Sequence, residues 1–228
     1  MLLLIFFGTM ALSLYASWRV RSNYNRYSKV ASSSGYTGAE VAQRILDLND
    51  IRDVTIHAAP GHLIDHYDPG NRRLVLSEEN YYGTSVAALG ISAHECGHAI
   101  QHKQLYAPLQ WRMAAVGITN IASQIVMWIP LIGLFGGFID YHLMITIMAV
   151  GFGIMMLFQL ITLPVEFDAT ARAKKILAHT GAVSPGAEFG AMSKVLDAAA
   201  LTYVAAFVSS LAYFIYYLMR MGGGRSEE

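Results

Sequence analysis

The stretch Ala93-His94-Glu95-Cys96-Gly97-His98 decides how the rest of this chain is interpreted. It contains the pattern H-E-x-x-H, in which two histidines lie four residues apart. On an α-helix such residues share one face, with Cβ atoms about 5–6 Å apart, so both imidazoles can reach a single Zn²⁺. The intervening Glu95 then lies beside the metal, where its carboxylate can take a proton from a water on the zinc. So short a pattern also arises by chance, and its context has to decide.

The residues around the motif favour a helix. Thr84 or Ser85 can cap its N-terminus, and apolar side chains follow at helical spacing, so we expect the helix to reach about His102. The motif then lies on a helix, as binding of one ion by two histidines requires. Gly97 either allows another backbone to approach this helix or is simply tolerated there.

The segment from about residue 35 to residue 103 is typical of a small water-exposed unit. Thr37-Gly38-Ala39-Glu40 has the capping-box pattern, which predicts a helix over about 38–49. Residues 54–56 and 73–76 are typical of short strands, and the turn pattern Asp68-Pro69-Gly70-Asn71 precedes the second of them. We therefore expect an α+β unit with a small β-hairpin or short sheet.

The composition indicates a membrane protein. Hydrophobic residues make up 54% of the chain and charged residues only 14%, against about 25% charged residues in soluble proteins. The formal net charge is zero, so the charge balance gives no reason to expect a nucleic-acid partner. The single cysteine, Cys96, excludes an intramolecular disulfide.

Four apolar stretches approach the roughly 17–25 residues that a membrane-spanning helix needs. The first resembles a signal peptide, but its basic residues follow the apolar run instead of preceding it, so we expect an uncleaved anchor. The stretches cover residues 1–17, 113–139, 143–163 and 198–219.

The basic residues orient these stretches. All of the 16 Lys and Arg residues except Arg220 and Arg225 lie in the segments 19–112 and 172–194. Because basic residues accumulate on the cytoplasmic side, we expect both segments in the cytoplasm and both termini outside.

The expected fold class is mainly α, with membrane helices and a zincin-like α+β segment. The expected regions are a transmembrane anchor (1–18), a cytoplasmic catalytic region (19–112), a transmembrane hairpin (113–164), a cytoplasmic helical region with the third zinc ligand (165–197), and a transmembrane helix with a short tail (198–228).

A catalytic zinc has three protein ligands and one open position. The first candidate for the third ligand is Glu166, because it follows the third apolar stretch and returns to the same side of the membrane as the motif. Asp168 is the rival candidate, or it orients a ligating histidine. Glu166 also has a structural interpretation, as an acid favoured near a helix N-terminus. His102 is a poor candidate, since a straight helix cannot easily wrap three consecutive turns around one ion.

The transition state of acyl transfer needs a hydrogen-bond donor for its oxyanion. His66 and Tyr67 precede the second expected strand, beside which an extended substrate can bind, and either side chain can donate. The alternative is that both are surface positions of the hairpin.

Together these segments resemble the YugP-type neutral zinc metallopeptidases of bacterial membranes. The resemblance implies a multi-pass membrane peptidase with zinc, with Glu95 as the catalytic acid and base and Glu166 as the third ligand. The chain is more distantly similar to the HtpX-like gluzincins, which have an aspartate four residues after the ligating glutamate; Thr170 occupies that position here. The matching segments are Ser34–Gly35, Thr37–Ala42, Asp65–Pro69, Leu76–Glu78, Ala93–His102 and Leu163–Ala169.

The resulting hypothesis is a zinc-dependent endopeptidase of the bacterial inner membrane, with its active site facing the cytoplasm. Its expected partners are Zn²⁺, the lipid bilayer and a membrane-associated protein or peptide substrate. The alternatives are a non-catalytic membrane scaffold with a structural zinc and a zinc hydrolase that acts on non-peptide bonds. The sequence gives no indication of oligomeric state or cleavage preference.

Overall fold

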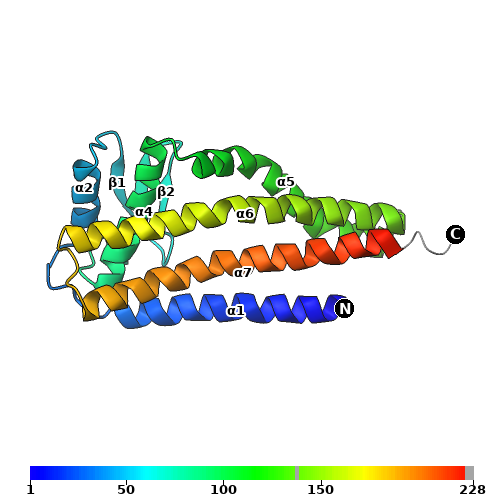
Figure 1. Ribbon diagram of the computed structural model, residues 1–228, viewed down its shortest axis with the longest axis horizontal. Helices are drawn as coiled ribbons and strands as arrows, with labels where there is room; N and C mark the ends of the chain where they lie inside the picture. Colours follow the sequence, from blue (N-terminus) through cyan, green and yellow to red (C-terminus); the bar gives the residue numbers. More distant parts are fainter. Residues whose placement is uncertain (137–138, 224–228) are drawn as a thin grey trace.

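The computed structural model describes residues 1–136 and 139–223, and these are mainly helical, with one short sheet (Figure 1). The prediction of a mainly α fold with a short sheet is confirmed. The helices are α1 (Leu2–Tyr27), α2 (Gly38–Leu48), α3 (Glu78–Tyr81), α4 (Val86–Lys103), α5 (Ala107–Gly136), α6 (Tyr141–His179) and α7 (Ala187–Gly223). The strands are β1 (Thr55–Ala59), β2 (His66–Asp68) and β3 (Arg73–Ser77).

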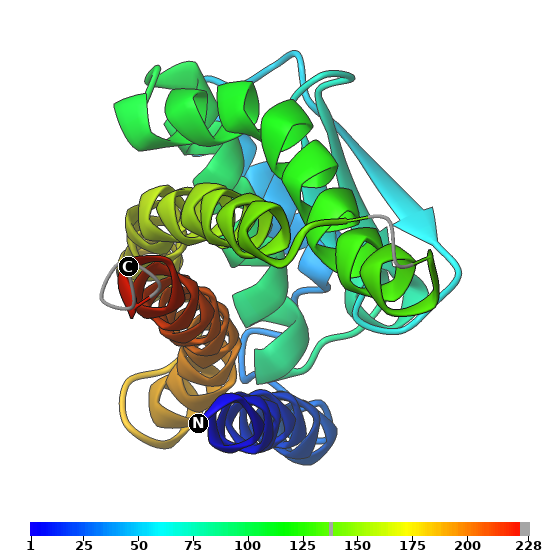
Figure 2. The same ribbon diagram turned by 90° about the vertical axis from the view of Figure 1, so that its right-hand side faces the viewer.

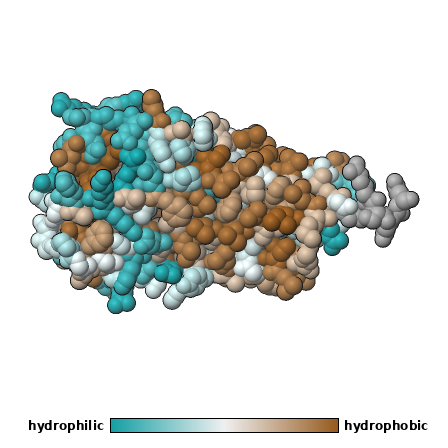
Figure 3. All heavy atoms as spheres, in the orientation of Figure 1, coloured by the Kyte–Doolittle hydropathy of each residue, from teal (hydrophilic) through white to brown (hydrophobic). Residues whose placement is uncertain are grey.

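Four of the helices, α1, α5, α6 and α7, are long and apolar enough to cross a membrane. Seen end-on, they lie side by side in the order α1, α7, α6, α5 (Figure 2). Figure 3 shows a broad hydrophobic band over these helices and a hydrophilic surface over the end that carries α2, α4 and the sheet. Apolar side chains on these helices are strongly exposed, for example Leu4 on α1 (78%) and Ile121 on α5 (63%). Exposed apolar surface on this scale is typical of a membrane interaction site.

Each long helix extends beyond the apolar stretch that predicted it. The 39 residues of α6 span about 58 Å at 1.5 Å per residue, whereas the hydrocarbon core of a bilayer is about 30 Å thick. The excess length carries residues of α6 into the hydrophilic end of the molecule. Asp140 caps α6 by accepting hydrogen bonds from the backbone of His142 and Leu143. Residues 137–138 of the second predicted stretch and the tail 224–228 lie outside the described residues.

The sheet has three strands in the order β1-β3-β2. β2 and β3 form a hairpin around the predicted turn, which Asp68 closes by accepting hydrogen bonds from the backbone of Gly70 and Asn71 at 3.0 and 3.1 Å. β1 pairs with β3 in parallel. The sequence patterns did not predict β2 as a strand, nor the parallel pairing. The buried side chains Leu74 and Leu76 of β3 face the core.

Local capping positions the two shorter main helices. Thr37 and Glu40 form the predicted capping box of α2, in which each side chain accepts a hydrogen bond from the other residue's backbone N–H. Ser85, not Thr84, caps α4 by accepting from Ala88 N at 3.1 Å. α4 runs through the centre of the hydrophilic end of the molecule and is buried along most of its length. It packs between α2 and the parts of α6 and α7 that reach this end. Its side chains are therefore held in fixed positions.

Candidate metal centre

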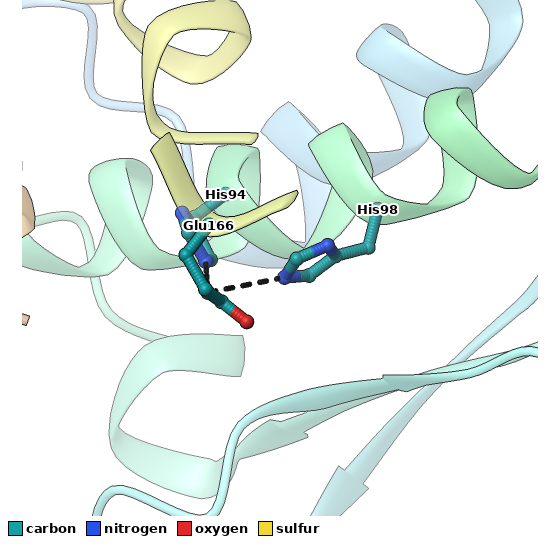
Figure 4. Close-up of side chains that lie close together, drawn as sticks. All are labelled: His94, His98 and Glu166. Atoms are coloured by element: carbon teal, nitrogen blue, oxygen red, sulfur yellow. Dashed lines mark ion pairs between the residues drawn. The ribbon is translucent and has the colours of Figure 1, made fainter. Parts of the chain in front are cut away.

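Three side chains converge where α4 meets α6: His94 and His98 from α4, and Glu166 from α6 (Figure 4). One potential ligand atom from each lies within 4.8 Å of the other two. Glu166 Oε2 is 3.3 Å from His94 Nε2 and 3.6 Å from His98 Nε2. In a tetrahedral zinc site with bonds of 2.0–2.1 Å, ligand atoms lie about 3.3 Å apart. The structure thus brings together the three residues expected to bind zinc, at distances that suit the ion.

The environment of Glu166 fits a cation. Its side chain is only 2% exposed, and Oε1 accepts a hydrogen bond from Arg112 Nη1 at 2.7 Å. The other oxygen, Oε2, is buried and has no hydrogen-bond partner among the described residues. A buried polar atom without a hydrogen-bond partner is costly, and a metal ion between Oε2 and the two imidazoles would supply the missing interaction.

The surroundings of His98 favour positive charge in the same place. Burial alone lowers its pKa, but the hydrogen bond to Glu166 and the negative charge of Glu95 outweigh burial, so that the pKa is raised. The cluster therefore stabilises a cation, either a proton or a metal ion, at its centre. Two neutral imidazoles and one carboxylate are a donor set that zinc accepts in catalytic sites.

A glycine permits the contact between the two helices. A Cβ atom on Gly97 would lie 2.9 Å from the carbonyl oxygen of Ala169 and 3.1 Å from its Cα atom. Ala169 lies one turn after Glu166 on α6. The close backbone approach that was one interpretation of Gly97 is confirmed, and it holds Glu166 against the histidines.

Gln101 fixes the orientation of His98. The side chain of Gln101 is fully buried, and its Nε2 donates to Val165 O and to Asp168 Oδ2, both at 2.8 Å. Its Oε1 lies 3.0 Å from His98 Nδ1. Because both amide hydrogens are used, Oε1 accepts and His98 Nδ1 carries the proton, an assignment that follows from the network. His98 Nε2 is then free to face Glu166.

His94 has a different partner. Its Nδ1 lies 3.3 Å from the hydroxyl oxygen of Thr170, so the residue that replaces the aspartate of the HtpX-like enzymes still contacts a candidate ligand. Ligating histidines commonly engage their second ring nitrogen in this way. The sequence patterns identified neither this contact nor the roles of Gln101 and Arg112. For Gln101 a signal exists, because a residue three positions after His98 shares its helix face.

Asp168 does not belong to the cluster of three. Its carboxylate binds Arg172 Nε at 2.5 Å and accepts from Gln101. This contact corresponds to the second interpretation of Asp168, in which it orients a ligating histidine, here through Gln101. His102 also points away from the cluster, with Nδ1 2.9 Å from the hydroxyl of Tyr67.

Glu95 lies between two cavities. One, of about 270 Å³, is lined by His94, His98, Glu166, His66 and Tyr67, among others. The other, of about 210 Å³, lies toward α1 and α7. Four residues line both cavities: Asp65, His94, Glu95 and Tyr203. Glu95, which is itself only 8% exposed, therefore borders both cavities beside the candidate ligand His94.

His66 and Tyr67 lie on β2, at the wall of the larger cavity. Tyr67 directs its hydroxyl toward His102, and His66 Nδ1 lies 2.8 Å from Ile64 O. Tyr203 of α7 also lines this wall and was not identified from the sequence. All three residues line the cavity that contains the candidate ligands.

The fold and the site define the class of the protein. It is a membrane protein with four long apolar helices. One of them, α6, brings a carboxylate to the helix that carries H-E-x-x-H, which is a site of the zinc-peptidase type. The chain belongs to the family described as "Putative neutral zinc metallopeptidase", whose model matches residues 2–222. It is also similar to the "Putative membrane protease YugP" of Bacillus subtilis (strain 168), with 44% identity over 220 residues that cover 96% of each chain. No solved structure gives a significant match. The family resemblance of the sequence motifs is thereby confirmed.

Proposed function

We propose that the protein is a zinc-dependent endopeptidase embedded in the bacterial inner membrane, with its active site on the cytoplasmic side. The observation that carries the proposal is the position of Glu95, a carboxylate beside a buried His-His-Glu cluster and between two cavities. A site that only binds structural zinc has no use for such a carboxylate, because its coordination is closed by protein ligands.

In this proposal His94, His98 and Glu166 hold the zinc ion, which supplies a polarised water and an electrophile for the scissile carbonyl. Glu95 accepts a proton as the carbonyl is attacked and then delivers it to the leaving amine. Arg112 keeps Glu166 Oε1 engaged, so that Oε2 faces the histidines. His66 or Tyr67 is the candidate donor for the oxyanion, by its place on the cavity wall.

The proposed substrates are membrane-associated proteins or peptides. The candidate ligands lie at the end of the apolar stretches, so a substrate bond has to reach the level at which the membrane helices leave the bilayer. Residues 19–112 and 165–197 then form the cytoplasmic part, with transmembrane helices before, between and after them.

The test compares purified parent protein with Glu95→Gln in detergent. We expect Glu95→Gln to retain zinc and to lose roughly 10²–10⁴-fold in cleavage of casein, because the proton acceptor is removed and the ligands stay. A zinc chelator should abolish cleavage by the parent. Glu78→Gln, at an exposed position on α3, is the matched control and should cleave like the parent.

Equal cleavage by parent and Glu95→Gln would show that Glu95 is not the base. Zinc without cleavage of any peptide, in the parent itself, would favour the scaffold or an enzyme that acts on other bonds. A screen of ester and amide substrates then separates these two alternatives.

A further inference from the structure

The cavity on the α1 and α7 side of Glu95 is lined by fewer charged and histidine side chains than the cavity that contains Glu166. Its lining is mostly apolar and comes from α1, α4, α7 and the segment before β2, with Val20, Leu63, Ile91, Leu196 and Ala199 among its residues. It opens beside His94 and Glu95 and shares both with the larger cavity. We call it the α1–α7 pocket.

We propose that the α1–α7 pocket is a specificity site that binds one bulky apolar side chain of the substrate next to the bond that is cleaved. The inference rests on the proposed peptidase function and adds to it the class of residue that the enzyme selects. A peptide that lies past Glu95 runs from one cavity into the other, because Glu95 lines both. One of its side chains then enters the α1–α7 pocket.

The size of the pocket suits such a side chain. Its volume is about 210 Å³, whereas an apolar cavity of about 150 Å³ already binds benzene. A leucine, methionine or phenylalanine side chain fits, and it would replace water against the apolar walls, which is favourable at about 25 cal/mol per Å² of apolar surface. A glycine or alanine would leave most of this space unused.

The charges at the pocket exclude acidic side chains. Asp65 and Glu95 line it, and none of its lining residues is Lys or Arg. The Asp65 carboxylate is fixed by hydrogen bonds from the backbone and hydroxyl of Ser77 and from Asn80 Nδ2. An aspartate or glutamate of the substrate would meet these carboxylates in a partly buried space, where like charges repel strongly.

The position of the pocket explains why its ligand is apolar. Val20 lies between Arg19 and Arg21, where the apolar run of α1 ends, and Ala199 lies where the apolar run of α7 begins. The pocket is therefore at the boundary between the polar end and the apolar band of the molecule. Substrate residues that reach this boundary are those at the ends of membrane-spanning helices and in amphipathic segments, which are rich in bulky apolar side chains.

The test is to digest casein and to identify the residues next to the cleaved bonds by mass spectrometry. The parent should show Leu, Met or Phe at one fixed position beside the cleaved bond and should avoid Asp and Glu there. Ala199→Phe fills the pocket, so the preference for Leu over Ala at that position should fall by roughly 10-fold or more. Ile91→Ala enlarges the pocket and should move the preference toward Phe and Trp.

The control is Val208→Phe, which adds the same side chain to α7 at an exposed position (40%) outside the pocket lining; it should keep the parent's preference. Zinc content of every variant is measured to show that the metal centre is intact. An unchanged preference in both Ala199→Phe and Ile91→Ala would overturn the inference while cleavage continues. Failure of the proposed function is a different result: no cleavage by the parent, or full cleavage by Glu95→Gln.

Discussion

At the scale of single residues, the candidate metal centre depends on which atoms of its ligand side chains are left without a hydrogen bond by the neighbouring side chains. Arg112 engages one oxygen of Glu166 and leaves the other without a partner among the described residues. Gln101 engages one nitrogen of His98 and leaves the other facing Glu166. The neighbours thus direct one free atom of each residue toward the same point, which is the arrangement that an ion with three protein ligands requires.

The contact between Gln101 and His98 gives the first prediction at this scale. Gln101→Leu keeps a similar volume but removes the acceptor of the proton on His98 Nδ1, so the ring is no longer held in one orientation. We expect the affinity for zinc to fall by roughly 10–100-fold, as for other residues that orient ligating histidines. Competition with a fluorescent zinc chelator measures this affinity on the folded protein and does not depend on activity.

Two further variants separate orientation from general damage. Gln101→Glu retains an acceptor for His98 and should bind zinc more tightly than Gln101→Leu does. Gln43→Leu makes the same substitution on the exposed face of α2 and should leave zinc affinity unchanged. Parental affinity in Gln101→Leu would refute the orienting role.

The sequence predicted the residues whose chemistry is local and missed those whose contacts are distant. His94, Glu95 and His98 form one motif on one helix, and Glu166 was found through the membrane topology. Arg112 lies 54 positions from Glu166 in the sequence, and no spacing rule connects residues on two separate helices. Their pairing depends on the way α5 and α6 pack, which one sequence does not give.

At the scale of elements, the site exists because α4 and α6 touch backbone to backbone. Gly97 makes that contact possible, and Ala169, on the other side of it, is also small. The capping residues Thr37 and Ser85 act at the same scale, because they fix where α2 and α4 begin. Such caps are read from a few neighbouring residues, and for that reason α2 and α4 were predicted closely. β2 and its pairing depend on contacts with β3 across the turn and with α4, and they were not predicted.

A methyl group at Gly97 should push α4 and α6 apart. In Gly97→Ala the new Cβ atom would overlap the backbone of Ala169, which cannot rotate away as a side chain can. We expect a loss of about 1–3 kcal/mol in the free energy of unfolding, which is typical of overpacking, together with weaker zinc binding because Glu166 moves away from His94 and His98. Thermal unfolding in detergent and zinc titration measure the two effects.

Gly190→Ala is the matched control for this variant. Gly190 lies on α7, and nothing is within 4 Å of the place where its Cβ atom would be. Alanine in an open helical position is more favourable than glycine by roughly 0.5–1 kcal/mol, so this variant should unfold at a higher temperature than the parent. If Gly97→Ala were also stabilising, the contact between α4 and α6 would be looser than described.

At the scale of the whole molecule, helix length sets the position of the site relative to the bilayer. Tyr141 and Glu166 lie about 38 Å apart along α6 at 1.5 Å per residue, slightly more than the roughly 30 Å of hydrocarbon in a bilayer. If Tyr141 lies at one membrane boundary, Glu166 emerges just beyond the other. The hydrophilic surface over α2, α4 and the sheet lies at this second boundary (Figure 3).

The two ends of α6 therefore provide a test of the proposed orientation. Cys96 is the single cysteine; it is fully buried, and burial raises the pKa of its thiol well above the usual range, so a maleimide should not label the parent. Tyr141→Cys and Ala178→Cys each place one exposed thiol near an end of the helix. In intact spheroplasts, a membrane-impermeant maleimide should label Tyr141→Cys and should label Ala178→Cys only after permeabilisation.

This labelling pattern is required if the basic segments and the metal centre face the cytoplasm, because α6 crosses the membrane once between the two positions. The reverse pattern would place the active site outside, and labelling of both thiols in intact spheroplasts would mean that α6 does not cross at all. Retained cleavage activity in both variants shows that the thiols report on the folded protein, since neither position lines the cavities beside Glu95. The side on which Ala178→Cys reacts thus decides from which compartment a substrate reaches Glu95.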